Sequence, residues 1–145
     1  MGIVDVMALR VVSVGPQASV RDAIGRMMSE NVGSVAVCDG PRLVGIFTER
    51  DVLRLAGGDE PFRQRRVEEV MTRTIVSVSP EDSVIAAAEL MRQHRIRHLP
   101  VLQGENLLGI VGIREVLGAL VGTALRAGDE TARETVHGLL SRSPR

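Results

Sequence analysis

The chain contains an internal repeat with a spacing of 64 residues. Residues 3–56 align with residues 67–120 without a gap. About a third of the aligned positions are identical, and a match of this extent at one fixed spacing indicates two copies of one folding unit. A unit of this size buries little apolar surface alone, so we expect the two copies to pack against each other.

Each copy predicts the element order β-α-β-β-α. In the first copy, apolar runs predict strands at 11–14, 34–38 and 43–47, with a turn at Asp39-Gly40 between the last two. Ser19 is a typical N-cap for the first helix, and Thr48 opens the second. We expect the buried face of the second helix to consist of Val52, Leu53, Leu55 and Ala56.

The predicted fold class is therefore α/β (α+β), with two such repeats packed sheet-to-sheet about a pseudo-two-fold axis. We place the first repeat at 1–58, a linker at 59–66, the second repeat at 67–122 and a helical tail at 123–145. In the tail, Asp129 or Thr131 is the expected helix cap. The apolar stripe expected there consists of Ala132, Val136, Leu139 and Leu140. Two roles for the tail stay open: packing on its own domain, or contacting a partner.

Composition excludes several functions. The chain has 18 basic and 18 acidic residues, no Trp or Tyr, and a single cysteine, Cys38, which we expect to be an inert buried thiol. This balance predicts no nucleic-acid partner and no membrane association, and we expect a cytoplasmic protein. His94, His98 and His137 are too scattered to predict a metal site. No catalytic motif is present, so the sequence does not predict an enzyme.

The two copies differ most informatively where a strand meets a helix. The stretch GIFTERDVLRLA (45–56) corresponds to GIVGIREVLGAL (109–120), so that Thr48 matches Gly112 and Asp51 matches Glu115. The start of a helix offers unpaired N–H groups to a phosphate, and Thr48 would add a hydroxyl. The Asp51 carboxylate would suit the two hydroxyls of a ribose. The alternative is structural, because Thr-x-x-Asp also resembles a helix capping box.

Three phrases, VEEVMTRTIVSVSPEDSV, HRIRHLPVL and GIFTERDVL, resemble the CBS domain, named after cystathionine β-synthase. The resemblance covers residues 3–120 and is closest to stand-alone bacterial and archaeal tandem pairs. It implies a regulatory binding module without catalytic activity. The implied ligands contain adenosine: AMP, ADP, ATP, NAD or S-adenosylmethionine. Such pairs often form disc-like homodimers and regulate an effector protein, whose identity the sequence leaves unknown. The first repeat departs from the pattern at Ala8, where the family usually has Thr.

The resemblance also implies two composite sites. The stronger nucleotide site would use Thr48, Arg50, Asp51, Thr72, Thr74, Ile75, Val76, Ile96, Arg97 and His98. The weaker one would use Ala8, Val11, Val12, Val32, Gly33, Ser34, Gly112, Arg114 and Glu115. The weaker set lacks both Thr hydroxyls, and Gly33 replaces Arg97, so we expect one good nucleotide site. Arg97 is a candidate phosphate ligand, but Arg92, Arg95 and Arg97 also fit a solvated basic surface, and His98 fits a core histidine.

Two functions of different class follow. In the first, the protein is an adenine-nucleotide sensor, for example of cellular energy state, that modulates a partner; an S-adenosylmethionine sensor is a variant of it. In the second, it is a ligand-independent dimerisation or interaction scaffold. The Thr48, Asp51, Thr72 and Arg97 set favours the sensor.

Overall fold

The computed structural model describes residues 1–9, 11–127 and 130–141. It divides into two compact units. The first-repeat unit comprises the described residues between Arg10 and Ile75, together with Gly104–Leu107. The second-repeat unit comprises Met1–Leu9, Val76–Gln103 and the described residues from Leu108 onward. Each unit is described by itself.

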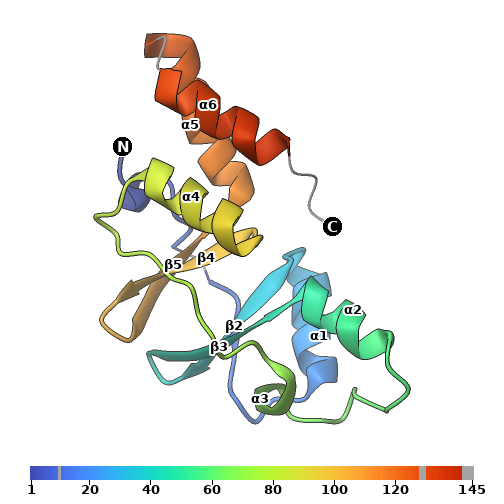
Figure 1. Ribbon diagram of the computed structural model, residues 1–145. Helices are drawn as coiled ribbons and strands as arrows, with labels where there is room; N and C mark the ends of the chain where they lie inside the picture. The colour runs from blue at the N-terminus through green and yellow to red at the C-terminus, as the bar shows by residue number, and fades with distance from the viewer. Residues whose placement is uncertain (10, 128–129, 142–145) are drawn as a thin grey trace. The chain divides into compact units, whose positions relative to one another are not determined.

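The first-repeat unit is built on a short sheet, shown in blue and green in Figure 1. Strand β2 (Ser34–Asp39) pairs in parallel with β1 (Ser13–Val14) and antiparallel with β3 (Arg42–Thr48). Gly40 forms the β2–β3 turn with a φ of 61°, a backbone conformation that glycine adopts at little cost. Its helices are α1 (Val20–Glu30), α2 (Glu49–Ala56) and α3 (Val67–Val70). The predicted strand pair, its turn and the Ser19 cap are confirmed.

Apolar side chains from these strands and helices form the core of the first-repeat unit. Phe47 on β3 is fully buried, as are Val35 and Val37 on β2. The rest of the cluster comes from α1 and from the leading segment of the second repeat: Val20, Ala23, Met27, Val67, Val70 and Met71. The segment around α3 therefore contributes to the core of the first-repeat unit.

Helix α2 does not bury the face that we predicted. Leu53 is 73% exposed and Ala56 is also exposed, whereas Val52 and Leu55 are partly buried against the core. The side chain that α2 buries is Asp51. At about 100° per residue, Leu53 points about 200° away from Asp51, so burial of the carboxylate turns Leu53 to the surface. The predicted face was wrong at Leu53 and Ala56.

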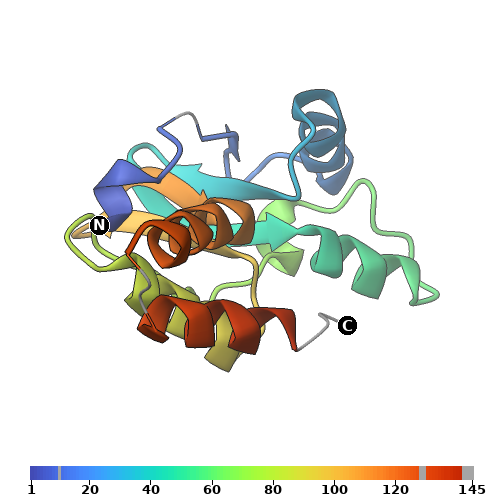
Figure 2. The ribbon, with the colours of Figure 1, turned by 90° about the horizontal axis from the view of Figure 1, so that it is seen from above.

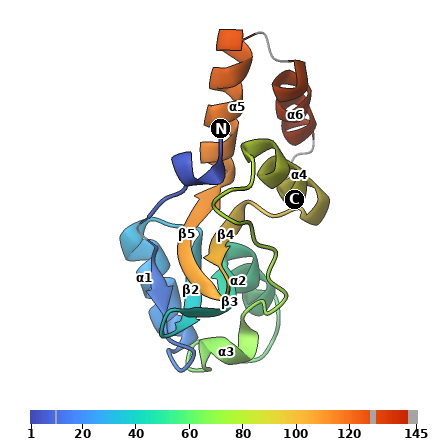
Figure 3. The same ribbon diagram turned by 90° about the vertical axis from the view of Figure 1, so that its left-hand side faces the viewer.

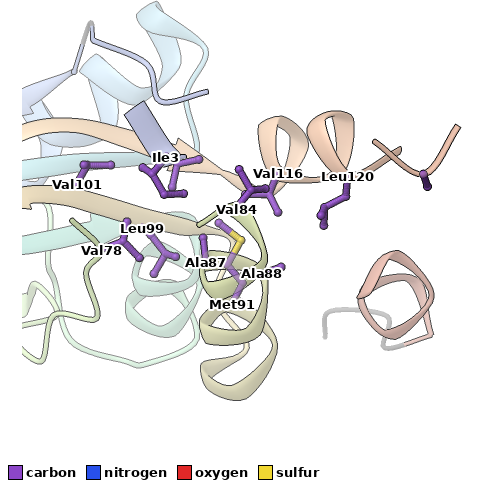
Figure 4. Close-up of a cluster of buried hydrophobic side chains, with 12 residues drawn as sticks. Ile3, Val78, Val84, Ala87, Ala88, Met91, Leu99, Val101, Val116 and Leu120 are labelled. Carbon is purple, nitrogen blue, oxygen red and sulfur yellow. The ribbon is translucent and has the colours of Figure 1, made fainter. Parts of the chain in front are cut away.

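The second-repeat unit has the same helix–strand–strand–helix order and ends with an additional helix (Figure 3). The first strand that we predicted for this repeat is not formed, since Val78 makes only an isolated bridge to Val101. It contains a short 3₁₀ turn η1 (Ile3–Asp5), helix α4 (Val84–His94), strand β4 (His98–Gln103), most of β5 (Asn106–Gly112), and helices α5 (Ile113–Ala127) and α6 (Glu130–Leu140). Its core joins Ile3 to side chains of α4, β4 and α5, including Met91, Leu99 and Val116 (Figure 4). The first residues of the chain are thus part of the core of this unit.

The tail forms a helix that packs on its own unit, as one of our two alternatives predicted. Helix α6 lies beside α4 and α5 (Figure 2), and its Val136 and Leu139 pack against their core. Helix α5 continues to Ala127, past the predicted repeat boundary at residue 122.

One part of the tail prediction was wrong, since Leu140, expected in the apolar stripe, is 67% exposed. Of the two predicted caps, Thr131 is excluded because it lies inside α6. Asp129 lies outside the described residues, as does the side chain of Ala132.

Each repeat's leading segment pairs with the last strand of the other repeat. Thr72 exchanges two backbone hydrogen bonds with Ile46 at 2.8 and 3.0 Å. At the corresponding positions, 64 residues away in each case, Ala8 exchanges two with Ile110 at 2.9 and 3.2 Å. Each contact lies within one unit. The leading segments are therefore exchanged between the repeats.

No helix in the described part of the chain combines the length and apolar character that crossing a membrane requires.

Glycine at position 109 is required for this exchange. A Cβ atom there would come within 2.6 Å of the Ala8 carbonyl oxygen, which is a backbone atom. We expect Gly109→Ala to lower the free energy of unfolding by about 2 kcal/mol, since overpacking against a fixed backbone forces it to shift. Chemical denaturation followed by circular dichroism would measure the change.

The matched control is Gly25→Ala in α1, where an added Cβ meets nothing within 4 Å. This substitution should raise the free energy of unfolding by up to about 1 kcal/mol, because alanine favours a helix over glycine. Equal effects of the two substitutions would contradict our account of the Ala8–Ile110 contact.

Candidate functional site

The site is centred on the junction between β3 and α2. Thr48 ends the strand and caps the helix in an extended conformation, with φ −121° and ψ 167°. Its hydroxyl accepts a hydrogen bond from the Asp51 N–H at 3.3 Å, and the Asp51 carboxylate accepts one from the Thr48 N–H at 3.0 Å. The capping box that we gave as the structural alternative is therefore complete. Glu49 N–H is also engaged, since it donates to the Gly33 carbonyl at 3.0 Å.

The Asp51 carboxylate also accepts hydrogen bonds from side chains. It is only 2% exposed. Oδ1 accepts from Arg54 Nη2 at 2.7 Å and lies 3.2 Å from the Thr72 hydroxyl. Oδ2 lies 3.2 Å from the Thr48 hydroxyl and 3.3 Å from that of Thr72. The cluster thus joins a threonine cap, a buried carboxylate, a surface arginine and a second threonine from 21 residues along the chain.

Thr72 reaches this cluster because of the exchanged segment. The Thr72–Ile46 backbone pair places residue 72 beside β3, and Met71 fills the space over Gly45, where any Cβ would overlap its side chain. A glycine in β3 therefore lets the leading segment approach closely. The sequence predicted Thr72 in the same site as Thr48 and Asp51, and these three residues are in contact.

The β5–α5 junction has the same backbone without the same polar groups. Ile113 N–H donates to the Arg97 carbonyl at 2.8 Å, matching the Glu49–Gly33 bond of the first-repeat unit. Gly112 is buried, and Glu115 is exposed. Ala8 stands where Thr72 does, and Gly118 stands where Arg54 does. The junction therefore folds without a threonine cap, so the hydroxyls at the first junction are not required for the turn.

The remaining predicted site residues divide between the two units. Of the stronger set, Arg50, Thr74 and Ile75 lie with the cluster in the first-repeat unit, and Val76, Ile96, Arg97 and His98 lie in the second-repeat unit. Of the weaker set, the first-repeat unit contains Val11, Val12, Val32, Gly33 and Ser34, and the second-repeat unit contains Ala8, Gly112, Arg114 and Glu115. Arg97 is exposed and His98 is half-buried. Their roles in ligand binding remain predictions.

The sequence reasoning missed Arg54. Its signal was available, because Asp51 and Arg54 are three residues apart on a predicted helix, where side chains face each other. The basic surface suggested near residue 95 is partly structural. Arg92 pairs with Glu89 at 2.9 Å, and Arg95 ends α4 in the left-handed conformation with a φ of 54°.

The described residues contain no group of three or more His, Cys, Asp or Glu side chains that could hold a metal ion. Cys38 is half-buried, and burial raises the pKa of its thiol, which lowers its thiolate fraction and hence its reactivity.

Thr72→Val tests the contact between the exchanged segment and the carboxylate. It removes a hydroxyl donor from a buried charged acceptor while nearly preserving shape, so we expect the free energy of unfolding to fall by about 1–2 kcal/mol. Thr72 and Thr74 are both exposed, so Thr74→Val is a matched control away from the Asp51 carboxylate and should change the free energy of unfolding by less than about 0.5 kcal/mol. Urea denaturation of both variants measures the difference. If Thr72→Val left the free energy of unfolding unchanged, the hydroxyl would contribute nothing to the stability of the fold.

Comparison with known proteins identifies the repeat. The model of the CBS domain family matches residues 3–58 and 67–122. The chain is 35% identical over 112 residues to the CBS domain-containing protein YhcV of Bacillus subtilis, which covers 77% of this chain and 80% of that protein. It spans about a third of the length of several other curated relatives. One is the arabinose 5-phosphate isomerase KdsD of Francisella tularensis, 35% identical over 105 residues, or 72% of this chain and 32% of the enzyme.

Solved structures show the same fold. The CBS-domain containing protein ATU1752 from Agrobacterium tumefaciens is 32% identical with a TM-score of 0.76, covering 82% of this chain and 98% of that one. CBSX2 in complex with AMP is 26% identical with a TM-score of 0.72, covering 83% and 96%. The CBS domain pair of protein MJ0100, in complex with 5′-methylthioadenosine and S-adenosyl-L-methionine, shares the fold at 22% identity and a TM-score of 0.76, covering 85% and 98%. The chain therefore belongs to the CBS domain family and carries two copies of the domain.

Proposed function

We propose that the protein is a regulatory module that binds an adenosine-containing ligand of the AMP class at the Thr48–Asp51–Thr72 cluster and thereby modulates a partner protein. One observation carries the proposal: of two junctions with the same backbone, only one gathers two threonine hydroxyls and a buried carboxylate. The complex of CBSX2 with AMP supports the ligand class.

The chemistry of the cluster suits a nucleotide. A carboxylate accepts hydrogen bonds from both hydroxyls of a ribose, and threonine hydroxyls beside a helix start can donate to a phosphate. Arg97, whose exposed guanidinium suits the geometry of a phosphate, stays a candidate phosphate ligand implied by the family resemblance. Regulation then requires that the ligand bind one conformation of the protein more tightly than another.

The completed capping box favours a second candidate function. Every donor and acceptor that Thr48 and Asp51 share is already paired within the fold, as expected for a purely structural turn. In that case the protein is a ligand-independent scaffold that dimerises or binds a partner. The two candidates differ in one measurable property, the binding of adenosine-containing ligands. S-adenosylmethionine remains the alternative ligand within the first candidate, since it also carries a ribose diol.

The test is calorimetric titration of nucleotide-free protein with AMP, ATP, NAD and S-adenosylmethionine, with Asp51→Asn as the site variant. Because the chain lacks Trp and Tyr, ultraviolet absorbance readily reveals nucleotide left from purification. We expect about one ligand per chain, and a loss of affinity of about tenfold to a hundredfold in Asp51→Asn, as removal of a charged acceptor predicts. Thr48 remains the N-cap, and the amide oxygen of an asparagine at position 51 can still accept the hydrogen bond from the Thr48 N–H, so the fold should persist.

Glu115→Gln, at the matching position of the second junction, is the control for Asp51→Asn and should leave this affinity unchanged within about twofold. Failure of all four ligands to bind at millimolar concentration would favour the scaffold. Equal losses in Asp51→Asn and Glu115→Gln would place the ligand elsewhere. If S-adenosylmethionine alone binds, the ligand class shifts to that variant.

A further inference from the structure

The hydrogen-bond acceptor positions of the Asp51 carboxylate are all occupied within the fold. A carboxylate accepts about four hydrogen bonds. Four groups compete for it here: the Thr48 N–H, the Thr48 hydroxyl, the Thr72 hydroxyl, and Arg54 Nη2 at the shortest distance, 2.7 Å. A ribose hydroxyl can therefore bind Asp51 only if one of these donors leaves.

Arg54 is the donor that leaves most easily. The Thr48 N–H is part of the helix cap, and Thr72 is held beside β3 by its two backbone bonds to Ile46. Thr72 is also exposed, but its backbone bonds fix its position, whereas the Arg54 side chain, 64% exposed on the outer surface of α2, can move its guanidinium from the carboxylate into water. Ion pairs with one exposed partner are weak because water competes for the charge.

We propose that Arg54 is an internal competitor of the ligand, which occupies Asp51 Oδ1 when the site is empty and must be displaced by the ribose diol. The inference rests on the proposed function. It assigns Arg54 a role in setting affinity. The arginine keeps a buried carboxylate paired in the empty protein, since an unpaired buried charge is costly, and it weakens the binding of every ligand that uses the same oxygen.

The second repeat supports this assignment. Gly118 stands at the position of Arg54, beside the exposed Glu115, so the pair occurs only at the junction that has the threonine hydroxyls. The strand-to-helix turn therefore forms without an arginine at this position. The arginine occurs at the junction that we propose as the ligand site.

The experiment is calorimetric titration of Arg54→Met with two uncharged probes, adenosine and 2′,3′-dideoxyadenosine. Methionine keeps most of the stem and removes the donors. Uncharged probes avoid any direct effect of the lost charge on a phosphate. We expect the affinity for adenosine to rise about threefold to tenfold, and the affinity for dideoxyadenosine, which has no diol, to stay unchanged. Arg54→Lys, which keeps the charge with a shorter reach, should lie between wild type and Arg54→Met.

Arg92→Met is the matched control, because Arg92 pairs with Glu89 at 2.9 Å with the same three-residue spacing on α4. It should leave both affinities unchanged. An adenosine affinity that stays equal or falls in Arg54→Met, while Asp51→Asn still weakens binding as expected, would overturn the inference and leave the proposed function standing. A gain that dideoxyadenosine shares would also overturn it, since the diol would then not be involved. If wild type and Arg54→Met both fail to bind adenosine and AMP, the proposed function itself fails.

Discussion

The backbone pair between Thr72 and Ile46 is the contact on which the candidate site depends. It holds the leading segment of the second repeat against the last strand of the first, so that a threonine hydroxyl from residue 72 reaches a carboxylate at residue 51. The site is thus assembled from parts of the chain that belong to different repeats in sequence and to one compact unit in space. The same exchange at Ala8 and Ile110 shows that it is a property of the repeat.

Because the two junctions share their backbone, the second serves as an internal reference for the first. What both contain, such as the Glu49–Gly33 and Ile113–Arg97 hydrogen bonds, belongs to the fold. What only the first contains, namely Thr48, Thr72 and the Asp51–Arg54 pair, requires another explanation. This comparison within one molecule separates structural from functional residues more sharply than the Thr-x-x-Asp pattern alone.

Much of the fold could be predicted because local signals and the repeat agree. The Ser19 cap and the turn at Gly40 follow from residues whose backbone preferences are strong, and each has a counterpart 64 residues away. The error on α2 has one physical cause. The apolar pattern predicts that Leu53 is buried, but burial of Asp51 turns Leu53 to the surface. Hydrophobic periodicity cannot predict this, because it treats a carboxylate as exposed even where four hydrogen-bond donors stabilise its burial.

For the site, the contact of Thr72 with Thr48 and Asp51 could be predicted only through resemblance to the family, since nothing local links residues 21 apart. Arg54 was overlooked for the opposite reason: its spacing from Asp51 is so common on helix surfaces that it carries little information. Its meaning emerges only when the acceptor capacity of the carboxylate is counted. The ligand roles of Arg97 and His98 are implied by the family resemblance and remain predictions.

The capping box and a ligand site need not be alternatives. The group that caps α2 is the same carboxylate that would bind a ribose, so one side chain would serve the empty and the occupied protein in turn. A cap made from an N–H and a hydroxyl uses the Oδ2 side, and Oδ1 is left to Arg54 and Thr72. Binding could then exchange the partner at Oδ1 while the cap at Oδ2 persists. The helix would remain folded throughout, and the guanidinium released from Asp51 would be the part of the first-repeat unit that distinguishes the two states.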